Sequence, residues 1–565
     1  MAQLSLTGKQ WILRESDGAG GSVVEALLKR RHIDALGEGE LLETFGHDAR
    51  HFRDFEKAAE RVRRAIDGKE TVGIFGDYDC DGITGATLLA RFFHRRNMRP
   101  SIRLPHRLKE GYGLQKSIVE DFQKTGITLL LTVDTGGSAV EPIALAQSLG
   151  IDVIVLDHHT ILETLPPAFA ILHPAFTTVA LDSPPCGAGV AWSFVSALEQ
   201  LDGHDDWDDR GTDVALGAIG TIADIVPLIG GNRTLAHSGL LALSGLRTGP
   251  LAMLCTNAGL QGPYNSRDVG FRIAPRINAA GRMDDPHIAL HALLGDMDSL
   301  LQLDALNRER QDVVAAHIED LLPRAGREEG DMLCFVSAEY SPGICGLLAG
   351  KLCEAYGKPA LVGAQVGEVS TASLRSIPGY DITAGLRRCG DLLLGFGGHA
   401  MAAGCSFKTE MFPLVRARLQ SDALTYTANI PRSPALGADG TLSIAQVTAT
   451  LCESLAVLEP FGEGNPEPRF IVENVHLEKI RRVGKIPRHL QATAAGRKVI
   501  GFNLAHLADE LSQPIDLLCK IGIDTWQGRR SPQLFLEDVR IAERIQMPGS
   551  KNQVSSGSKQ KTSSF

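Results

Sequence analysis

Several apolar runs in the first half of the chain stop directly at acidic or imidazole side chains. The run Val72–Gly76 is followed by acids at alternate positions, Asp77, Asp79 and Asp81. A second run ends at Asp134, and a third ends at an acid and two imidazoles, Asp157, His158 and His159. Buried strands that stop in this way can aim several metal ligands at one point. Hard divalent cations take oxygen ligands, and manganese also accepts an imidazole. The pattern therefore predicts a two-metal hydrolytic centre for phosphate esters.

The spacing of these runs predicts an α/β fold with a parallel sheet. Apolar runs alternate with helix-like segments, the runs at 71–76, 101–104, 127–133 and 151–156 and the helices at 84–96, 115–124 and 138–149. Strands joined by single helices form right-handed crossovers, and such sheets bind ligands beyond the carboxyl ends of their strands. The acids and imidazoles occupy those ends, so the fold and the proposed ligands agree.

The aspartate triplet leaves its own geometry open. Acids at alternate positions would share one face of a continuing strand, but Gly76 and Gly82 indicate a turn that decides which of the three acids reach the metals. A calcium loop would need a later bidentate Glu and flanking helices, and neither pattern is present. We expect Asp134, on the central strand, to bridge the two metals. The segment 213–227 reads as an apolar helix with Asp224 near its end. Asp224 is the candidate for the last ligand, because a carboxylate there is costly to bury without a cation.

Length and composition indicate a protein of several domains in a reducing compartment. The chain has 565 residues, and its ten cysteines contain no Cys-x-x-Cys pair, which indicates neither a zinc ribbon nor a disulfide framework. No apolar run reaches the roughly 18 residues that a membrane span needs, and the N-terminus lacks the pattern of a signal peptide. We therefore expect a cytoplasmic protein without a membrane partner.

The domain organisation follows from changes in pattern along the chain. Short strands towards the C-terminus, including a hairpin at 516–526 and 532–541, indicate a small barrel, and helices that include 301–322 precede a second α/β unit. The predicted division is an N-terminal helical region 1–68, a phosphoesterase domain 69–234, a helical linker 235–328, a smaller α/β domain 329–428, a barrel 429–545 and a disordered tail 546–565.

The net charge of −10 argues at first against a nucleic-acid partner, but local basic tracks can outweigh it. One track runs from Arg91 to Lys109 without an acid, and a second runs from Arg481 to His489. The alternative for each track is an ordinary solvated face.

Motifs in a fixed order give the chain a family resemblance. It resembles the DHH phosphoesterases, and within them the RecJ-type single-strand DNA exonucleases, from about residue 45 to 545. The resemblance rests on Gly76-Asp-Tyr-Asp-Cys-Asp-Gly82, Pro105-His-Arg-Leu-Lys-Glu-Gly-Tyr-Gly113, Asp134-Thr-Gly136, Asp157-His-His159, Cys186-Gly-Ala-Gly189, Pro275-Arg-Ile-Asn-Ala-Ala-Gly-Arg282, Gly397-Gly-His399 and Leu458-Glu-Pro-Phe-Gly-Glu-Gly-Asn-Pro466.

The resemblance implies a DHH domain and a DHHA1 domain joined by a long helix, with a C-terminal OB-like barrel. It implies two Mn²⁺ or Mg²⁺ ions and 5′-to-3′ degradation of single-stranded DNA to mononucleotides in recombination, mismatch repair and base-excision repair. The implied metal ligands are Asp77, Asp79, Asp81, Asp134, His158 and Asp224. The implied catalytic residues are Asp79, Asp134, His158 and His159, with His159 orienting the site or contacting the scissile phosphate. The implied substrate-binding residues are Arg107, Arg276, Asn278, Arg282, Ser373, Arg375 and His399, most of them around the terminal 5′ phosphate.

Two positions depart from the family pattern. Such enzymes often have Trp-His-x-Gly where this chain has Tyr340-Ser341-Pro342-Gly343, so Ser341 receives no catalytic role. The barrel motif His-Leu-Lys is His489-Leu490-Gln491 here, which would weaken one phosphate contact. Neither change affects a predicted metal ligand.

Two other functions are compatible with parts of the pattern. One is a phosphodiesterase for short RNAs or cyclic dinucleotides, although those relatives are shorter and lack the third domain. The other is a non-cutting scaffold like the superfamily member of the eukaryotic replicative helicase, which loss of ligands would mark, and no ligand is lost here. For the exonuclease, the expected partners are single-stranded DNA with a 5′ end, a RecQ-type helicase and a single-stranded-DNA-binding protein, and the expected oligomeric state is a monomer.

Overall fold

A computed structural model of the chain describes residues 4–14, 22–33, 47–107, 110–111, 113–161, 163–203, 207–428, 435–484, 486–526 and 529–542. These residues divide into two compact units. One unit comprises residues 28–432 and 457–467, and the other comprises 1–27, 433–456 and 468–565. The predicted disordered tail, 546–565, lies outside the described residues. None of the described helices is long and apolar enough to cross a membrane.

The first unit begins with the predicted parallel sheet. Its strands are β2 (Val72–Gly76), β3 (Ser101–Arg103), β4 (Leu129–Val133), β5 (Asp152–Leu156) and β6 (Ala170–Leu172), in the order β3-β2-β4-β5-β6, and all neighbours are parallel. The first four strands confirm the predicted apolar runs. Strand β6 escaped prediction because it contributes only three residues at the edge.

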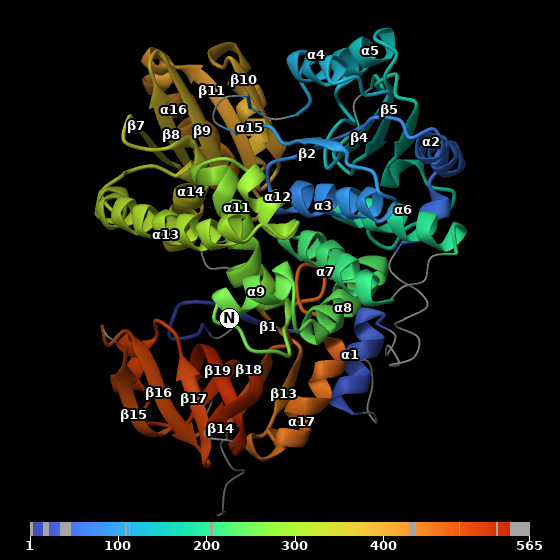
Figure 1. The fold of residues 1–565 in the computed structure, drawn as a ribbon. Helices are drawn as coiled ribbons and strands as arrows, with labels where there is room; N and C mark the ends of the chain where they lie inside the picture. The colour runs from blue at the N-terminus through green and yellow to red at the C-terminus, as the bar shows by residue number, and fades with distance from the viewer. Residues whose placement is uncertain are drawn as a thin grey trace, which may run out of the picture. The chain divides into compact units, whose positions relative to one another are not determined.

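Alternate residues of these strands face two separate cores, which is why each strand is apolar throughout. Ile74 and Leu131 pack with α2 (Phe55–Asp67), α3 (Cys80–Arg95) and α6 (Gly187–Leu201), whereas Phe75 and Leu130 pack with α4 (Lys116–Lys124) and α5 (Val140–Ser148). Figure 1 shows α4 and α5 on one side of this sheet and α3 and α6 on the other. Both faces are covered, so the carboxyl edge of the sheet is the place left for a ligand.

A series of helices connects the sheet to a second α/β domain. They are α7 (Trp207–Ala223), α8 (Gly230–Gly245), α9 (Pro250–Asn257), α10 (Ser266–Asp268), a π-helical stretch (Val269–Ile273), α11 (Ala274–Met283), α12 (His287–Leu293) and α13 (Met297–Ala325). The last one contains the predicted long helix 301–322. Helix α13 packs against both α11 and α14, so it links the two domains within one unit.

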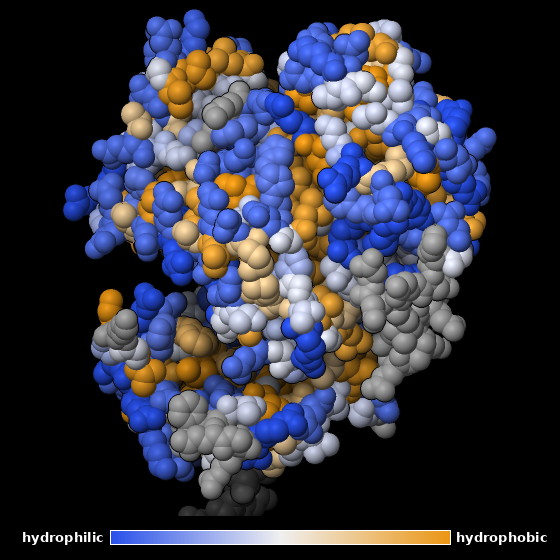
Figure 2. Space-filling model, viewed as in Figure 1, coloured by the Kyte–Doolittle hydropathy of each residue, from blue (hydrophilic) through white to orange (hydrophobic). Residues whose placement is uncertain are grey.

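The second domain has a mixed sheet in the order β10-β11-β9-β8-β7. Its elements are β7 (Leu333–Ser337), α14 (Pro342–Tyr356), β8 (Ala360–Val366), β9 (Val369–Arg375), α15 (Ile382–Arg388), β10 (Gly395–His399), β11 (Ala402–Lys408) and α16 (Phe412–Thr427). Edge strand β10 is exposed along its length, as are Leu394, Phe396 and Met401 in or beside it. Figure 2 shows hydrophobic residues gathered at the end of this domain where β10 and β11 lie.

The second unit is built mainly from strands. The strands β13 (Gly440–Leu442), β14 (Phe470–Val475), β15 (Glu478–Val483), β16 (His489–Ala494), β17 (Arg497–Gly501), β18 (Ile515–Trp526) and β19 (Arg529–Ile541) form one sheet in the order β13-β14-β18-β19-β17-β16-β15. The antiparallel pair β18–β19 confirms the predicted hairpin. Helix α17 (Ala449–Ser454) contacts this pair.

The N-terminal region is not purely helical, contrary to the sequence prediction for residues 1–68. Helices α1 (Val23–Arg31) and α2 are present, but β1 (Trp11–Leu13) pairs in parallel with β12 (Leu436–Ala438) of the strand-rich unit. The indole Nε1 of Trp11 donates to the buried carboxylate of Asp538 at 2.8 Å. A partner 527 residues away leaves no local signal, which is why this strand was missed.

Candidate metal centre

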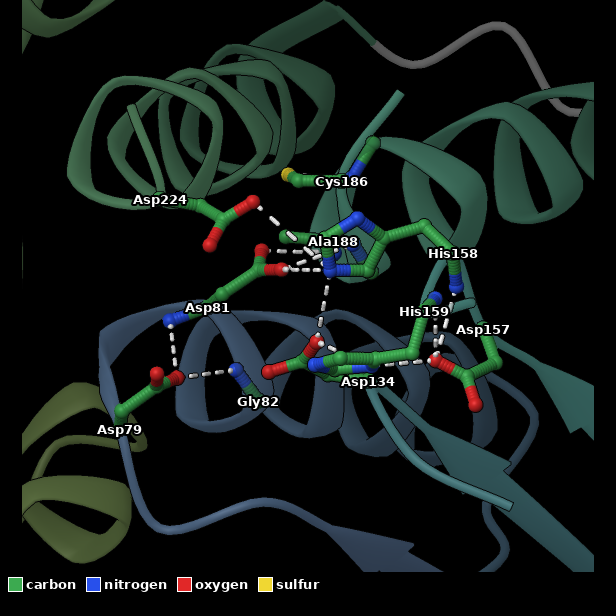
Figure 3. A network of polar contacts seen from close by, with 12 residues as sticks. Asp79, Asp81, Gly82, Asp134, Asp157, His158, His159, Cys186, Ala188 and Asp224 are labelled. Atoms are coloured by element: carbon green, nitrogen blue, oxygen red, sulfur yellow. Dashed lines mark hydrogen bonds and ion pairs between the residues drawn. The ribbon is translucent and has the colours of Figure 1, made fainter. Parts of the chain in front are cut away.

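The carboxyl edge of the parallel sheet gathers the predicted acids around one imidazole. His158 Nε2 lies 3.2 Å from Asp134 Oδ1, 3.7 Å from Asp224 Oδ2 and 3.8 Å from Asp81 Oδ2. Figure 3 shows these side chains converging from β4, β5, α3 and the end of α7. Three overlapping groups have ligand atoms within 4.8 Å of one another: Asp134, His158 and His159; Asp81, His158 and Asp224; and Asp77, Asp79 and Asp134.

The aspartate triplet forms the turn that Gly76 and Gly82 indicated. Asp79 is the N-cap of α3, and its Oδ1 accepts hydrogen bonds from the backbone N–H groups of Asp81 and Gly82 at 3.0 and 3.2 Å. A Cβ at Gly82 would lie 2.5 Å from the backbone nitrogen of Asp77, so no other residue fits this turn without a shift. The turn directs Asp77 and Asp79 towards Asp134, and Asp81 towards His158 and Asp224.

Asp81 is held by a helix N-terminus that the sequence analysis did not connect with it. Its two carboxylate oxygens accept hydrogen bonds from Gly187 N–H at 2.7 Å and Ala188 N–H at 2.8 Å, at the start of α6. The positive end of a helix stabilises a carboxylate. A Cβ at Gly187 would lie 2.5 Å from Asp134 Cβ. The motif Cys186-Gly-Ala-Gly189 therefore positions Asp81 and leaves room for Asp134.

Asp134 adopts a strained backbone conformation, with φ of 60°. Non-glycine residues rarely occupy the left-handed region, and they persist there when the surroundings impose it. Asp134 also belongs to two of the three ligand groups. Both observations support the predicted bridging role of this residue.

In the triplet Asp157-His158-His159, the histidines belong to candidate metal-binding groups, whereas Asp157 orients its neighbours. Asp157 accepts hydrogen bonds from the backbone N–H groups of Gly137 at 2.7 Å and His158 at 2.7 Å, and its Oδ1 lies 2.8 Å from His159 Nδ1. Asp157 is thus an orienting residue, a role that the triplet alone did not reveal. Burial alone would lower the pKa of His159, but Asp157 and the other carboxylates raise it to about 9. The hydrogen bond and charge of Asp157 therefore favour the protonated form of His159.

The remaining acids repel one another. Burial, followed by the charges of neighbouring acids, raises the pKa of Asp77, Asp79 and Asp134 above the ordinary value, and raises that of Asp224 to about 9. Among the described residues, the buried Oδ1 of Asp77 has no hydrogen-bond partner. Buried acids of this kind need cations to ionise together, so the oxygen-rich donor set fits two divalent ions.

A cluster of arginines borders the carboxylates. The guanidinium of Arg107 lies 5.1 Å from the ring centre of Tyr78. Tyr78 is the residue between Asp77 and Asp79 in the sequence. Burial lowers the pKa of Arg282, and the charges of Arg107 and Arg310 lower it further, to about 9. Burial also lowers the pKa of Arg375, with a further contribution from Arg107. Buried cations that repel one another in this way would be stabilised by an anion.

The predicted substrate residues lie on different elements, and some of them already have partners within the protein. Ser373 and Arg375 lie two residues apart on β9, where the Nη2 of Arg375 would be 3.1 Å from a Cβ at Gly346 of α14. Arg276 instead pairs with Asp304 at 2.8 Å, and the Oδ1 of Asn278 accepts a hydrogen bond from the backbone N–H of Cys80 at 2.9 Å. Asn278 therefore supports the aspartate turn. His399 lies at the exposed end of β10, and its carbonyl accepts a hydrogen bond from Thr383.

Arg310 was missed by the sequence analysis. It lies on α13, where its Nη2 donates to Asn307 Oδ1 at 2.8 Å, and among the described residues its buried Nε has no partner. Its charge lowers the pKa of Arg282. An arginine within a long charged helix gives no pattern that separates it from its exposed neighbours.

The first predicted basic track is largely an ion-pair network. Arg91 pairs with Asp213 at 2.5 Å, Arg95 with Glu199 at 2.8 Å, and Arg96 with Asp202 at 2.7 Å. These pairs join α3 to α6 and to the helix that carries Asp224. The solvated-face alternative and the nucleic-acid track are both wrong for these three residues.

In the second predicted basic track, from Arg481 to His489, the first two arginines point to opposite faces of β15. Arg482 pairs with Asp509 at 2.6 Å, whereas Arg481 lies in a groove of about 670 Å³ with Lys479, Gln491, Thr493 and Lys498. Gln491, where the family motif has Lys, accepts a hydrogen bond from Arg481 Nε at 2.8 Å. The other departure, Ser341, is the N-cap of α14 and accepts a hydrogen bond from Gly343 N–H, while Tyr340 packs edge-on against His317.

Family models match three parts of the chain: the DHH family, N-terminal domain, at residues 71–219, the DHHA1 domain at 330–423, and the RecJ OB domain at 438–538. The single-stranded-DNA-specific exonuclease RecJ of Bacillus subtilis is 32% identical over 92% of this chain and 68% of its own length. The crystal structure of RecJ from Thermus thermophilus in complex with Mn²⁺ has a TM-score of 0.80 at 30% identity, covering 92% of this chain and 76% of that one. The complex of the same protein with Mg²⁺ has a TM-score of 0.74 at 29% identity, covering 92% and 75%.

Proposed function

The chain belongs to the RecJ family of single-stranded-DNA-specific exonucleases, and we propose that it hydrolyses single-stranded DNA from its 5′ end at a centre of two Mn²⁺ or Mg²⁺ ions. The observation that carries the proposal is the electrostatic interaction between two clusters of opposite charge. Acids that need cations interact with arginines that need an anion: the charge of Arg282 lowers the pKa of Asp79, and that of Arg107 lowers the pKa of Asp77.

The arginine cluster supports the polarity. A terminal phosphate is a dianion, and guanidinium groups bind such a group better than a phosphodiester within a strand. A 5′ phosphate held by Arg107, Arg282 and Arg375 would place the first phosphodiester beside the carboxylates. Only the nucleotide at the end could occupy both clusters, so cleavage would proceed from that end.

The chain's own residues orient the reacting phosphate. The metals would be held by Asp77, Asp79, Asp81, Asp134, His158 and Asp224. When bound, they would neutralise the phosphate and lower the pKa of a bound water. His159, whose Nδ1 lies 2.8 Å from Asp157 Oδ1, would donate a hydrogen bond to a phosphate oxygen. The groove that contains Lys479, Arg481 and Lys498 would contact the backbone of the strand further along, in a salt-dependent manner.

The cellular setting is part of the same proposal. A single strand with a free 5′ end arises in recombination, mismatch repair and base-excision repair, in the cytoplasm. A RecQ-type helicase and a single-stranded-DNA-binding protein would expose it. Both charged clusters lie within one unit of one chain, which supports a monomer. The non-cutting scaffold is disfavoured because every predicted ligand is present.

The test is digestion of 5′-labelled and 3′-labelled single-stranded DNA, with a duplex control, in Mn²⁺ and in EDTA. The proposal requires metal-dependent release of the 5′ label as a mononucleotide, with the duplex left intact. Release of the 3′ label first would reverse the polarity. Binding without release of either label would make the scaffold the better explanation.

A further inference from the structure

The segment Val457–Glu467 lies within the OB-domain sequence but packs with the nuclease unit. The OB-domain model spans it, at residues 438–538, whereas its contacts assign it to the unit that carries the metal centre. The chain returns to the strand-rich unit at Pro468, two residues before β14 begins. In Figure 1 it is the orange loop beside α7 and α8.

Arg233 of α8 fixes one end of this segment. Its Nη2 donates to the carbonyls of Val457 and Glu459, each at 2.9 Å. Arg233 is only 4% exposed, and no ion pair with it occurs among the described residues. Burial lowers its pKa. A buried guanidinium without a carboxylate is costly, and losing these two carbonyls would leave it nearly unsatisfied, so the contact holds the segment firmly.

The other end lies against the turn that follows Asp224. The backbone N–H of Leu228 donates to the carbonyl of Glu463 at 2.7 Å. Gly462 and Gly464 allow the close approach, because a Cβ would lie 2.7 Å from Leu228 Cδ1 at the first position and 3.0 Å from Pro227 Cβ at the second. Asn465 keeps the segment folded by donating to the carbonyls of Leu458 and Pro460.

The turn itself is strained and cross-linked. Ile225 has φ of 61°, a conformation that a β-branched residue adopts only when its surroundings impose it. Asn232, fully buried and adjacent to Arg233, donates to the carbonyl of Pro227 at 3.1 Å and to that of Pro184 at 2.9 Å. Pro184 leads into α6, whose N-terminus holds Asp81. The segment therefore acts on a framework that carries two candidate ligands.

We propose that residues 457–467, anchored by Arg233, position Asp224 for metal binding. The inference rests on the proposed metal site and assigns this part of the OB-domain sequence a role in the metal centre. The strain at Ile225 would relax if the segment withdrew, and the nearby carboxylate of Asp224 would move with the turn. The prediction is a weaker metal site in a protein that is otherwise folded.

The test measures Mn²⁺ dissociation constants of the full chain by electron paramagnetic resonance of free Mn²⁺, alongside the melting temperature in EDTA. Two variants loosen the segment: Arg233→Met, which keeps the volume, and Gly464→Ala. Two matched controls carry the same changes elsewhere: Arg247→Met, at an exposed arginine after α8, and Gly126→Ala, at a glycine with φ of 77° and open space around it. Arg233→Lys keeps a donor and tests for rescue.

We expect Mn²⁺ binding to weaken about 5- to 20-fold in both test variants, to stay within about twofold in both controls, and to recover at least in part in Arg233→Lys. Unchanged Mn²⁺ affinity in a folded Gly464→Ala or Arg233→Met protein would overturn the inference, even if the melting temperature fell. If Arg233→Met does not fold, Gly464→Ala decides alone. Failure of the unaltered protein to bind Mn²⁺ would instead overturn the proposed function.

Discussion

The two charged clusters of the nuclease unit have opposite signs, but in both of them like charges are buried close to one another. The acids Asp77, Asp134 and Asp224 have raised pKa values because they are buried beside one another, and Arg282 has a lowered pKa for the same reason. The acids come from strand and helix ends of one domain, whereas the arginines come from the loop after β3, from α11, from α13 and from β9. One cluster is built within a single domain, and the other exists only when two domains meet.

This difference explains what the sequence could predict. The order of strands in a parallel sheet brings their carboxyl ends together, so apolar runs that stop at acids identify a shared site. No comparable rule connects Arg107 with Arg375, because their proximity depends on how α11, α13 and α14 pack. Family resemblance supplied most of the arginines, and it did not supply Arg310.

Residues with structural rather than chemical roles were the hardest to assign. Arg91 and Arg95 formed part of a predicted basic track, but their partners, Asp213 and Glu199, are more than 100 residues away. Asn278 was predicted to bind substrate, and the structure adds that its Oδ1 accepts a hydrogen bond from the aspartate turn. In each case the side chain was correctly seen as important, and its partner could only be found in the folded chain.

The largest effect is expected for the acid at the centre of the first cluster. Asp134→Asn should lower exonuclease activity at least about 1,000-fold, on the order of 4 kcal/mol, because Asp134 belongs to two ligand groups. It should also raise the melting temperature in EDTA, since one repelling charge is gone. Single-turnover digestion and thermal denaturation measure the two effects. Asp121→Asn, on the exposed face of α4, is the control, and retention of activity within about threefold would remove Asp134 from the centre.

The corresponding change in the arginine cluster should be smaller and selective. Arg375→Gln should lower kcat/KM on 5′-phosphorylated strands about 10- to 100-fold, as expected for loss of a charge-assisted hydrogen bond. Strands with a 5′ hydroxyl should be cut at nearly the same rate by both proteins. Arg387→Gln, at an exposed position of α15, should change neither rate. Equal losses on both substrates would contradict a role at the terminal phosphate.

A still smaller effect is expected for Arg310, the arginine of this cluster that lies on α13. Arg310→Met should lower kcat/KM on 5′-phosphorylated strands about 3- to 10-fold, because it removes from the cluster one of the positive charges that act on Arg282. The loss should shrink in high salt only slightly, since the group is largely buried. Comparison of kcat/KM at two salt concentrations tests this, and a gain in activity would show that Arg310 opposes binding.

The weakest expected effect is the pH dependence of the metal-free protein. The pKa of Asp224 is about 9 in the folded chain and 3.8 in a model peptide, so between those values the folded protein binds more protons than the unfolded one. Its stability should then fall as pH rises, by a few degrees in melting temperature between pH 6 and 9 in EDTA. Saturating Mn²⁺ should reduce the slope. A melting temperature in EDTA that rises over this range would show that the acids do not share a buried site.

The pairing of β1 with β12 has a consequence for how the chain reaches its folded state. Trp11 meets Asp538 across 527 residues, and ribosomes add roughly 5–20 residues per second. Strand β1 is therefore synthesised on the order of half a minute to two minutes before Asp538, and the nuclease unit is synthesised between them. Of the two units, the strand-rich one is completed after the nuclease unit although it includes β1, and until β12 is made β1 is an unpaired strand, which can pair with other chains.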